Sequence, residues 1–190
     1  MEMDDALAKL ATRLDKWFDG SKAAFASEDH TSQRNAILRG IAIIKDIDQL
    51  KAEGLSTIGS MLERKNETPE SERSVLLVRT FEFAAKLEAA LNDELLDTDG
   101  ANTLILRMND VANALDATSK GRAALAALLD HPDERVRASA GAYLVNLIPE
   151  RVIPILREID EKSGANSAGR TAHWALLDWE LREKACGEKK

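Results

Sequence analysis

Apolar residues recur every three or four positions along most of the chain, which is the spacing of one face of an α-helix. No stretch alternates between apolar and polar residues for more than a few positions, so the pattern gives little support to β-strands. The clearest stripe of the first half predicts a helix from about Thr31 to Glu53 that ends at Gly54, because glycine is common just beyond the last turn of a helix. The residues of this stripe are Ile37, Ile41, Ile44, Ile47 and Leu50.

Further stripes predict helices on both sides of this one. Thr68 and Pro69 are predicted to start a helix, as an N-cap followed by proline at the first helical position. The turn signal at 97–100 separates that helix from the next one, which should end before Gly121. In chain order, the stripes of these helices are Leu7, Leu10, Leu14, Trp17 and Phe18; Ile58, Met61 and Leu62; Val75, Val78, Phe81 and Ala85; and Leu104, Met108, Val111 and Leu115.

The last third of the chain predicts two antiparallel helical hairpins. A short apolar helix from Arg122 to Leu129 is broken at 130–133, and a second helix runs from Glu134 to Leu147. The next unit starts at Pro149, and Ser167 is predicted to cap its second helix. Small and branched residues repeat between the two units at a constant offset of 32: Val136, Ala140 and Leu144 match Ala168, Ala172 and Leu176. A period of this size is typical of stacked helical hairpins, none of which can bury its apolar face alone.

A weaker self-similarity relates the two halves of the chain. At an offset of 67, Asn35, Ile37 and Gly54 correspond to Asn102, Leu104 and Gly121. We therefore divide the chain into an N-terminal helical part, 1–98, that is a candidate diverged copy of the second half, a repeat domain, 99–185, and a disordered tail, 186–190. The fold expected is all-α, with about seven to nine helices in stacked antiparallel hairpins.

Charge is divided unevenly along the chain. Residues 1–119 hold 14 basic and 22 acidic residues, a net charge of −8, whereas residues 120–190 hold 12 and 11, a net charge of +1. An acidic part of this kind repels phosphate backbones and suits a basic protein partner, so the composition disfavours nucleic acid as a ligand.

The compartment is expected to be the cytoplasm. The single cysteine, Cys186, cannot form an internal disulfide, which favours a reducing environment. The acidic start at 1–5 lacks the positive charge of a signal peptide, and no stretch reaches the length of about 20 apolar residues that crosses a bilayer. We expect no membrane association.

The segment from Leu129 to Arg137, with Ala140 and Leu144 after it, resembles the HEAT-repeat signature, in which an acidic turn with proline precedes Val-Arg and a spaced Ala and Leu. Residues 100–180 also resemble an uncharacterised bacterial domain family of HEAT-like helices. The resemblance implies a HEAT-like α-solenoid, and it carries no established activity that could be transferred to this chain.

Residue types that carry out catalysis are present but scattered. His30, His131 and His173 have no partners at metal-ligand spacing, and His131, beside Pro132, is expected to be a turn residue. The carboxylate pairs Asp46/Asp48 and Glu180/Glu183 are expected to be solvated charges. No phosphate loop or nucleophile motif is visible. We expect no enzyme activity and no cofactor or metal.

The best candidates for a binding surface lie in the C-terminal part. Helical spacing places Arg170, Trp174 and Asp178 on one side of a helix, and Trp and Arg are enriched at binding hot spots. The alternative is that Trp174 or Trp179 caps the end of the helical stack. Arg135 and Arg137 form a candidate row with Arg170 that could face an acidic ligand, although Arg137 is also suited to pair with Asp133 within its own turn.

These features predict a protein-interaction module of a bacterial cytoplasm, and in its most specific form an immunity or antitoxin-like protein that neutralises a basic partner. Two alternatives stay open. One is a HEAT-like nucleic-acid-binding or DNA-repair protein, which would need a basic groove. The other is an accessory or assembly subunit of an enzyme. The oligomeric state is not predicted.

Overall fold

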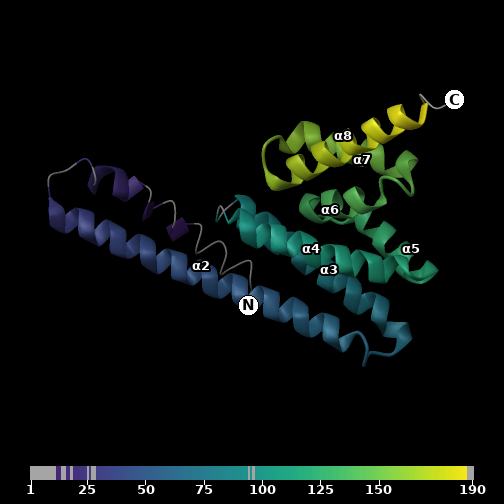
Figure 1. Ribbon diagram of the computed structural model, residues 1–190, viewed down its shortest axis with the longest axis horizontal. Coiled ribbons are helices and arrows are strands. Elements are labelled where there is room, and N and C mark those ends of the chain that lie inside the picture. The colour runs from purple at the N-terminus through teal and green to yellow at the C-terminus, as the bar shows by residue number, and fades with distance from the viewer. Residues whose placement is uncertain are drawn as a thin grey trace.

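The computed structural model describes residues 12–13, 16–17, 19–24, 26, 29–93, 95 and 97–187. Every regular element in these ranges is a helix, which confirms the all-α prediction (Figure 1). The elements with defined bounds are α2 (His30–Arg64), α3 (Glu70–Asp93), α4 (Thr98–Asp116), α5 (Ser119–Ala127), the 3-10 helix η1 (Leu128–Asp130), α6 (Glu134–Leu144), α7 (Pro149–Ser163) and α8 (Ser167–Gly187).

Helix α3 is the centre of the arrangement, because it packs against α2, α4, α5, α6 and α8. All residues of its segment 84–91 except Lys86 are buried, so this part of the helix is covered on almost every side. One cluster of buried side chains extends from Ile43 to Leu176 and continues without a break across residue 98, where the sequence suggested a division. The two parts of the chain therefore share a core along the α3–α4 interface.

Helix α2 does not end at Gly54, so the prediction of two separate helices there is wrong. Gly54 is buried in the interior of a helix that continues to Arg64. A Cβ at this position would overlap the side chain of Leu87 in α3. The glycine is thus used for the close approach of two helices and not for a left-handed turn at a helix end.

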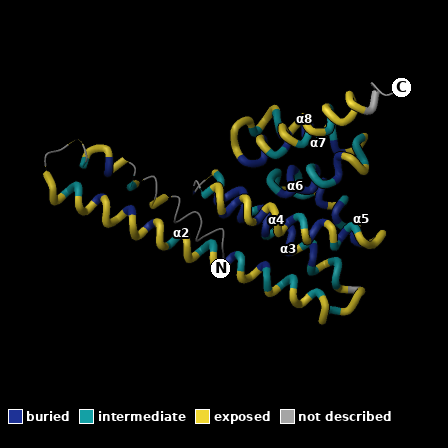
Figure 2. Tube along the Cα trace, viewed as in Figure 1, coloured by how far each residue is buried: buried dark blue, intermediate teal, exposed yellow. Residues whose placement is uncertain are grey.

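The face of α2 that is buried differs in part from the predicted one. Ile47 of the predicted stripe is buried and Leu50 packs against the core, but Ile37, Ile41 and Ile44 are exposed, and Ala36, Gly40 and Ile43 are buried in their place (Figure 2). Trp17 explains the choice of face: its indole Nε1 donates to the carbonyl of Ala36 at 2.7 Å, and its ring lies where a Cβ on Gly40 would be. The predicted stripe is therefore covered in its second half, at Ile47 and Leu50, and exposed in its first half.

The start of α3 also differs from the prediction. Thr68 does not cap α3, because its hydroxyl donates to the carbonyl of Arg64 at 2.7 Å and so completes the end of α2. The carbonyl of Pro69 accepts from the amides of Glu72 and Arg73 and opens α3.

The C-terminal helices follow the predicted repeat closely. All six positions of the 32-residue offset are buried, which confirms the inner faces of α6 and α8. The turn before α6 is held locally: the amide of Asp133 donates to Nδ1 of His131 at 3.0 Å, and Asp133 then caps the helix. The predicted cap of α8 is wrong by one residue, because Asn166 accepts from the amide of Gly169 at 2.9 Å.

Some predictions fall outside the described residues. These are the positions Leu7, Leu10, Leu14 and Phe18 of the first helix, and 188–190 of the tail. Helix α8 extends to Gly187, two residues beyond the predicted start of that tail.

Candidate functional site

The described part of the chain contains an open cavity of about 480 Å³ between α3, α4, α6 and α8. Arg170, Trp174 and Asp178 lie at successive turns of α8 and line one wall of it, as their helical spacing predicts. Asn102 and Ile105 of α4 line the cavity as well. The cavity thus joins α3 to α8, whose lining residues Glu88 and Asp178 are far apart in the sequence.

Glu88 of α3 is the least expected residue in this cavity. It is only 4% exposed, although it is a carboxylate among the buried alanines and leucines of α3. Asn92 donates to it at 2.7 Å from one turn away, and the hydroxyl of Ser167 donates at 3.2 to 3.3 Å from the start of α8. Burial raises the pKa of Glu88, because the ionised form loses its hydration, and the two hydrogen bonds oppose this rise.

Asp93, one turn beyond Glu88, fixes the start of α8 against α3. Both of its carboxylate oxygens accept from the amide of Ser167 at 2.8 Å. Arg170 then reaches back to Asp93 at 3.3 Å and also donates to the carbonyl of Ala165. A carboxylate is favourable at this place because the amides at a helix N-terminus carry partial positive charge. The charge of Arg170 is therefore already matched in part by groups of the chain itself.

The rim of the cavity is amphipathic. Trp174 is 64% exposed, although it is the largest side chain in the cavity wall. The ring of His173 meets it edge to face, with the centroids 5.9 Å apart. Asp178, one turn further on, pairs with Arg182 at 2.8 Å. Trp179 instead packs against the core.

Tyr143 of α6 stands behind this cavity. Its ring packs edge to face on Phe81 at 5.7 Å, and its hydroxyl is 3.4 Å from the carbonyl of Ile105, to which it donates. Burial raises the pKa of the phenol far above its ordinary value, and the negative charges of Glu88 and Asp110 add to the effect. The phenol therefore stays neutral and serves as a fixed hydrogen-bond donor.

The other two predicted residues, Arg135 and Arg137, are not part of the cavity wall. Arg135 pairs with Asp133 at 2.8 Å; although burial acts in the opposite direction, the hydrogen bonds from Arg135 hold the pKa of Asp133 below its ordinary value. The suggested pair between Arg137 and Asp133 is wrong. Arg137 donates to the carbonyls of His131 and Pro132, at 2.8 and 3.1 Å, and so belongs to the turn.

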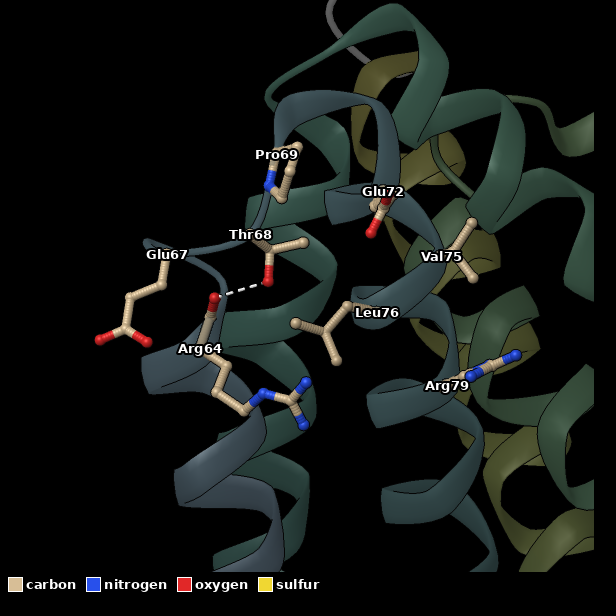
Figure 3. A pocket seen from close by; sticks show the side chains of 8 residues that line it. All are labelled: Arg64, Glu67, Thr68, Pro69, Glu72, Val75, Leu76 and Arg79. Atoms are coloured by element: carbon tan, nitrogen blue, oxygen red, sulfur yellow. Dashed lines mark hydrogen bonds between the residues drawn. The ribbon is translucent and has the colours of Figure 1, made fainter.

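A second cavity lies where α2 turns into α3 (Figure 3). Two arginines, Arg64 and Arg79, and two carboxylates, Glu67 and Glu72, line it around Pro69. The charges of its wall balance, and no buried polar side chain of the wall points to one class of ligand. We therefore take the cavity beside α8 as the candidate site.

Within the described ranges, no group of three His, Cys, Asp or Glu side chains is placed to hold a metal ion. Among the same residues, none of the helices combines the length and the apolar character needed to cross a membrane.

The sequence predicted the wall of the cavity that α8 forms, and it missed the floor, which is formed by Glu88 of α3. Glu88 and Asp93 carry no motif, since a carboxylate in an amphipathic helix is normally solvated. The one available signal is the apolar stretch around Glu88, 84–91, which predicts a helix buried all round and hence a buried charge.

Comparisons with protein-family models, with curated proteins and with solved structures give no match to this chain.

Proposed function

We propose that this chain is a protein-interaction module without catalytic activity, which holds a segment of a partner protein in the cavity beside α8. The observation that carries the proposal is the exposed ring of Trp174 on the wall of a cavity that contains a buried carboxylate. Tryptophan is the residue type most often found to dominate binding energy, and it does so where a pocket can exclude water from it. A tryptophan that only filled the core would be placed like Trp179.

The packing of the C-terminal helices is compatible with a HEAT-like stack, which is part of the same proposal. Helices α6, α7 and α8 pack on one another, and α6 and α8 both pack on α3. The inner positions repeat with the 32-residue offset and are buried in both copies. Repeat proteins of this kind bind their partners on surfaces formed by several successive units. The cavity is likewise lined by residues of several helices, α3, α4, α6 and α8. The HEAT-like α-solenoid is therefore part of the proposal.

The chemistry of the cavity favours a basic segment of the partner. The carboxylates of Glu88 and Asp178 line the same cavity as the indole ring of Trp174, and the face of such a ring attracts ammonium and guanidinium groups. Arg170 does not oppose such a ligand strongly, because Asp93 already binds it. The net charge of −7 would also increase the rate at which a basic partner is encountered.

In its most specific form, the proposal is an immunity or antitoxin-like protein that neutralises a basic toxin in a bacterial cytoplasm. Small acidic helical proteins suit this role because electrostatic attraction speeds association with a basic target. The same carboxylates would repel the phosphates of a nucleic acid.

The proposal is tested by capture from a lysate of the native host at moderate salt, with three immobilised proteins compared side by side. These are the natural chain, Trp174→Ala and Leu106→Ala. Leu106 is 66% exposed on α4 and does not line the cavity, so it is a control of matched exposure. We expect one basic protein to be retained by the natural chain and by Leu106→Ala and to be lost from Trp174→Ala. Equal retention by all three would exclude the cavity as the binding site, and retention of a duplex oligonucleotide with steep salt dependence would favour a nucleic-acid-binding function.

A further inference from the structure

The N-terminal half of α2 presents an apolar stripe that the chain itself leaves exposed. Ile37, Ile41 and Ile44 are 50%, 45% and 59% exposed, respectively. Arg34 and Asp48 extend this stripe by one step at each end. The five positions follow one another at intervals of three and four residues, which is the heptad spacing of helices that pair along their length.

This stripe is distinct from the face of α2 that belongs to the core. The covered face contains Ala36, Gly40 and Ile43, on which Trp17 lies. The exposed stripe is turned away from these residues by about a quarter of the helix circumference or more, as the 100° step per residue requires. In addition, the N-terminal half of α2 extends away from α5 to α8, so these helices would not obstruct a second helix there; of the described parts of the chain, the segment within 12–26 lies beside this half (Figure 1).

The order of charges along the stripe makes it complementary to itself in one orientation only. It has a cation at the start, Arg34, three isoleucines in the middle, and an anion at the end, Asp48, whose exposed carboxylate is 3.7 Å from Lys51 of the same helix. If two copies pair in antiparallel fashion, each Arg34 lies near the Asp48 of the other copy. A parallel pair would instead bring like charges together at both ends, which is unfavourable.

We propose that α2 is a homodimerisation helix and that the stripe pairs with its copy on a second chain, antiparallel and around a two-fold axis near Ile41. A closed two-fold contact of this kind uses the same surface on both chains and covers the three exposed isoleucines of each. In this register Leu38, which is 53% exposed beside the stripe, lies opposite Ile44 of the other chain. The cavity beside α8 stays accessible on both copies, so the dimer would offer two equal binding sites.

Sedimentation velocity over a range of concentrations tests this proposal with the full chain. We expect the natural protein to be a dimer at micromolar concentration, and Ile41→Lys to be a monomer with unchanged far-ultraviolet circular dichroism. Leu106→Lys is the matched control, because it adds the same charge at an exposed apolar residue of α4, and it should dimerise like the natural chain. A natural protein that stays monomeric at high micromolar concentration overturns the proposal, as does an Ile41→Lys protein that still dimerises.

A charge exchange tests the orientation. Arg34→Glu places a carboxylate near Asp48 of the other chain and should raise the dissociation constant of the dimer several-fold, about threefold to tenfold. Adding Asp48→Arg to the same chain restores opposite charges in an antiparallel pair and should recover the dimer. In a parallel pair, the double variant would again place like charges together. Failure of the double variant to recover dimerisation would therefore exclude the antiparallel arrangement.

Discussion

The hydroxyl of Ser167, the first residue of α8, donates to the buried carboxylate of Glu88 in α3, which lies 79 positions earlier in the chain. This contact forms the floor of the candidate site and joins the two helices that build it. It also places an ionisable group where ionisation is unfavourable, since burial raises the pKa of Glu88. The position of Glu88 therefore has a measurable consequence for stability.

Glu88→Gln should make the protein more stable at neutral pH. Because the folded-state pKa of Glu88 lies above its ordinary value of 4.5, ionisation costs folding free energy. The cost is absent below pH 4.5, where both the folded and the unfolded states are protonated. It grows as the pH rises through the raised pKa and is then constant. Urea unfolding of both proteins between pH 4 and pH 8 should show curves that coincide at the acid end and separate at the neutral end.

Glu158 supplies the control for this experiment. It is exposed on α7, and the hydrogen bond from Lys162 lowers its pKa. The stability that it adds is present above its ordinary pKa and is lost as the pH falls, so Glu158→Gln should have a small effect of the opposite sign. If Glu88→Gln were less stable than the natural protein at pH 7, the description of Glu88 as a destabilised carboxylate would be wrong.

Two glycines of α2 should respond to alanine in opposite directions. At Gly54 a Cβ meets Leu87, and the cost of overpacking, about 1 to 3 kcal/mol, exceeds the gain in helix propensity of about 1 kcal/mol. At Gly59 nothing lies within 4 Å, so alanine should stabilise the protein by about 0.5 to 1 kcal/mol. Thermal unfolding monitored by circular dichroism measures both effects.

The double variant with Leu87→Ala identifies the cause of the Gly54 effect. If Leu87 is the obstacle, Gly54→Ala becomes stabilising once that side chain is truncated. If Gly54 ended a helix in a left-handed conformation, as the sequence suggested, the substitution would stay destabilising in both backgrounds.

Arg137→Ala should reduce stability and leave partner binding unchanged. Its guanidinium donates to the carbonyls of His131 and Pro132, and the loss of these bonds should cost about 0.5 to 1.5 kcal/mol. Arg157→Ala, at an exposed position of α7, should change stability by less than about 0.5 kcal/mol. Chemical unfolding of the two variants checks the difference. A loss of binding without a loss of stability would instead assign Arg137 to the interface.

The sequence-based predictions were most accurate where local turn signals and the 32-residue offset indicate the same helices. The turn around Pro132 and the offset between Val136 and Ala168 fixed α6 and α8, and with them the wall that carries Trp174. Cap and turn signals act over three or four residues, so one sequence is enough to read them.

The predictions failed where a residue can be used in two ways. A glycine such as Gly54 can either end a helix or allow a neighbouring side chain to approach the helix closely. The sequence does not show which role applies, because the role depends on the packing partner, here Leu87. Likewise, the stripe of Ile37 and Ile41 has the periodicity of a core face, but the position of Trp17 selects the other side of α2. The floor of the cavity could not be predicted because the contact of Glu88 with Ser167 depends on how distant helices pack.

The most direct test of the central claim is titration calorimetry of the captured partner against the natural chain and Trp174→Ala, with Leu106→Ala as control. If the cavity beside α8 holds the partner, loss of the indole should weaken binding by about 2 kcal/mol or more, roughly a thirtyfold rise in the dissociation constant. Leu106→Ala should bind within about twofold of the natural chain. Unchanged affinity of a folded Trp174→Ala would contradict the account and place the binding surface elsewhere on the molecule.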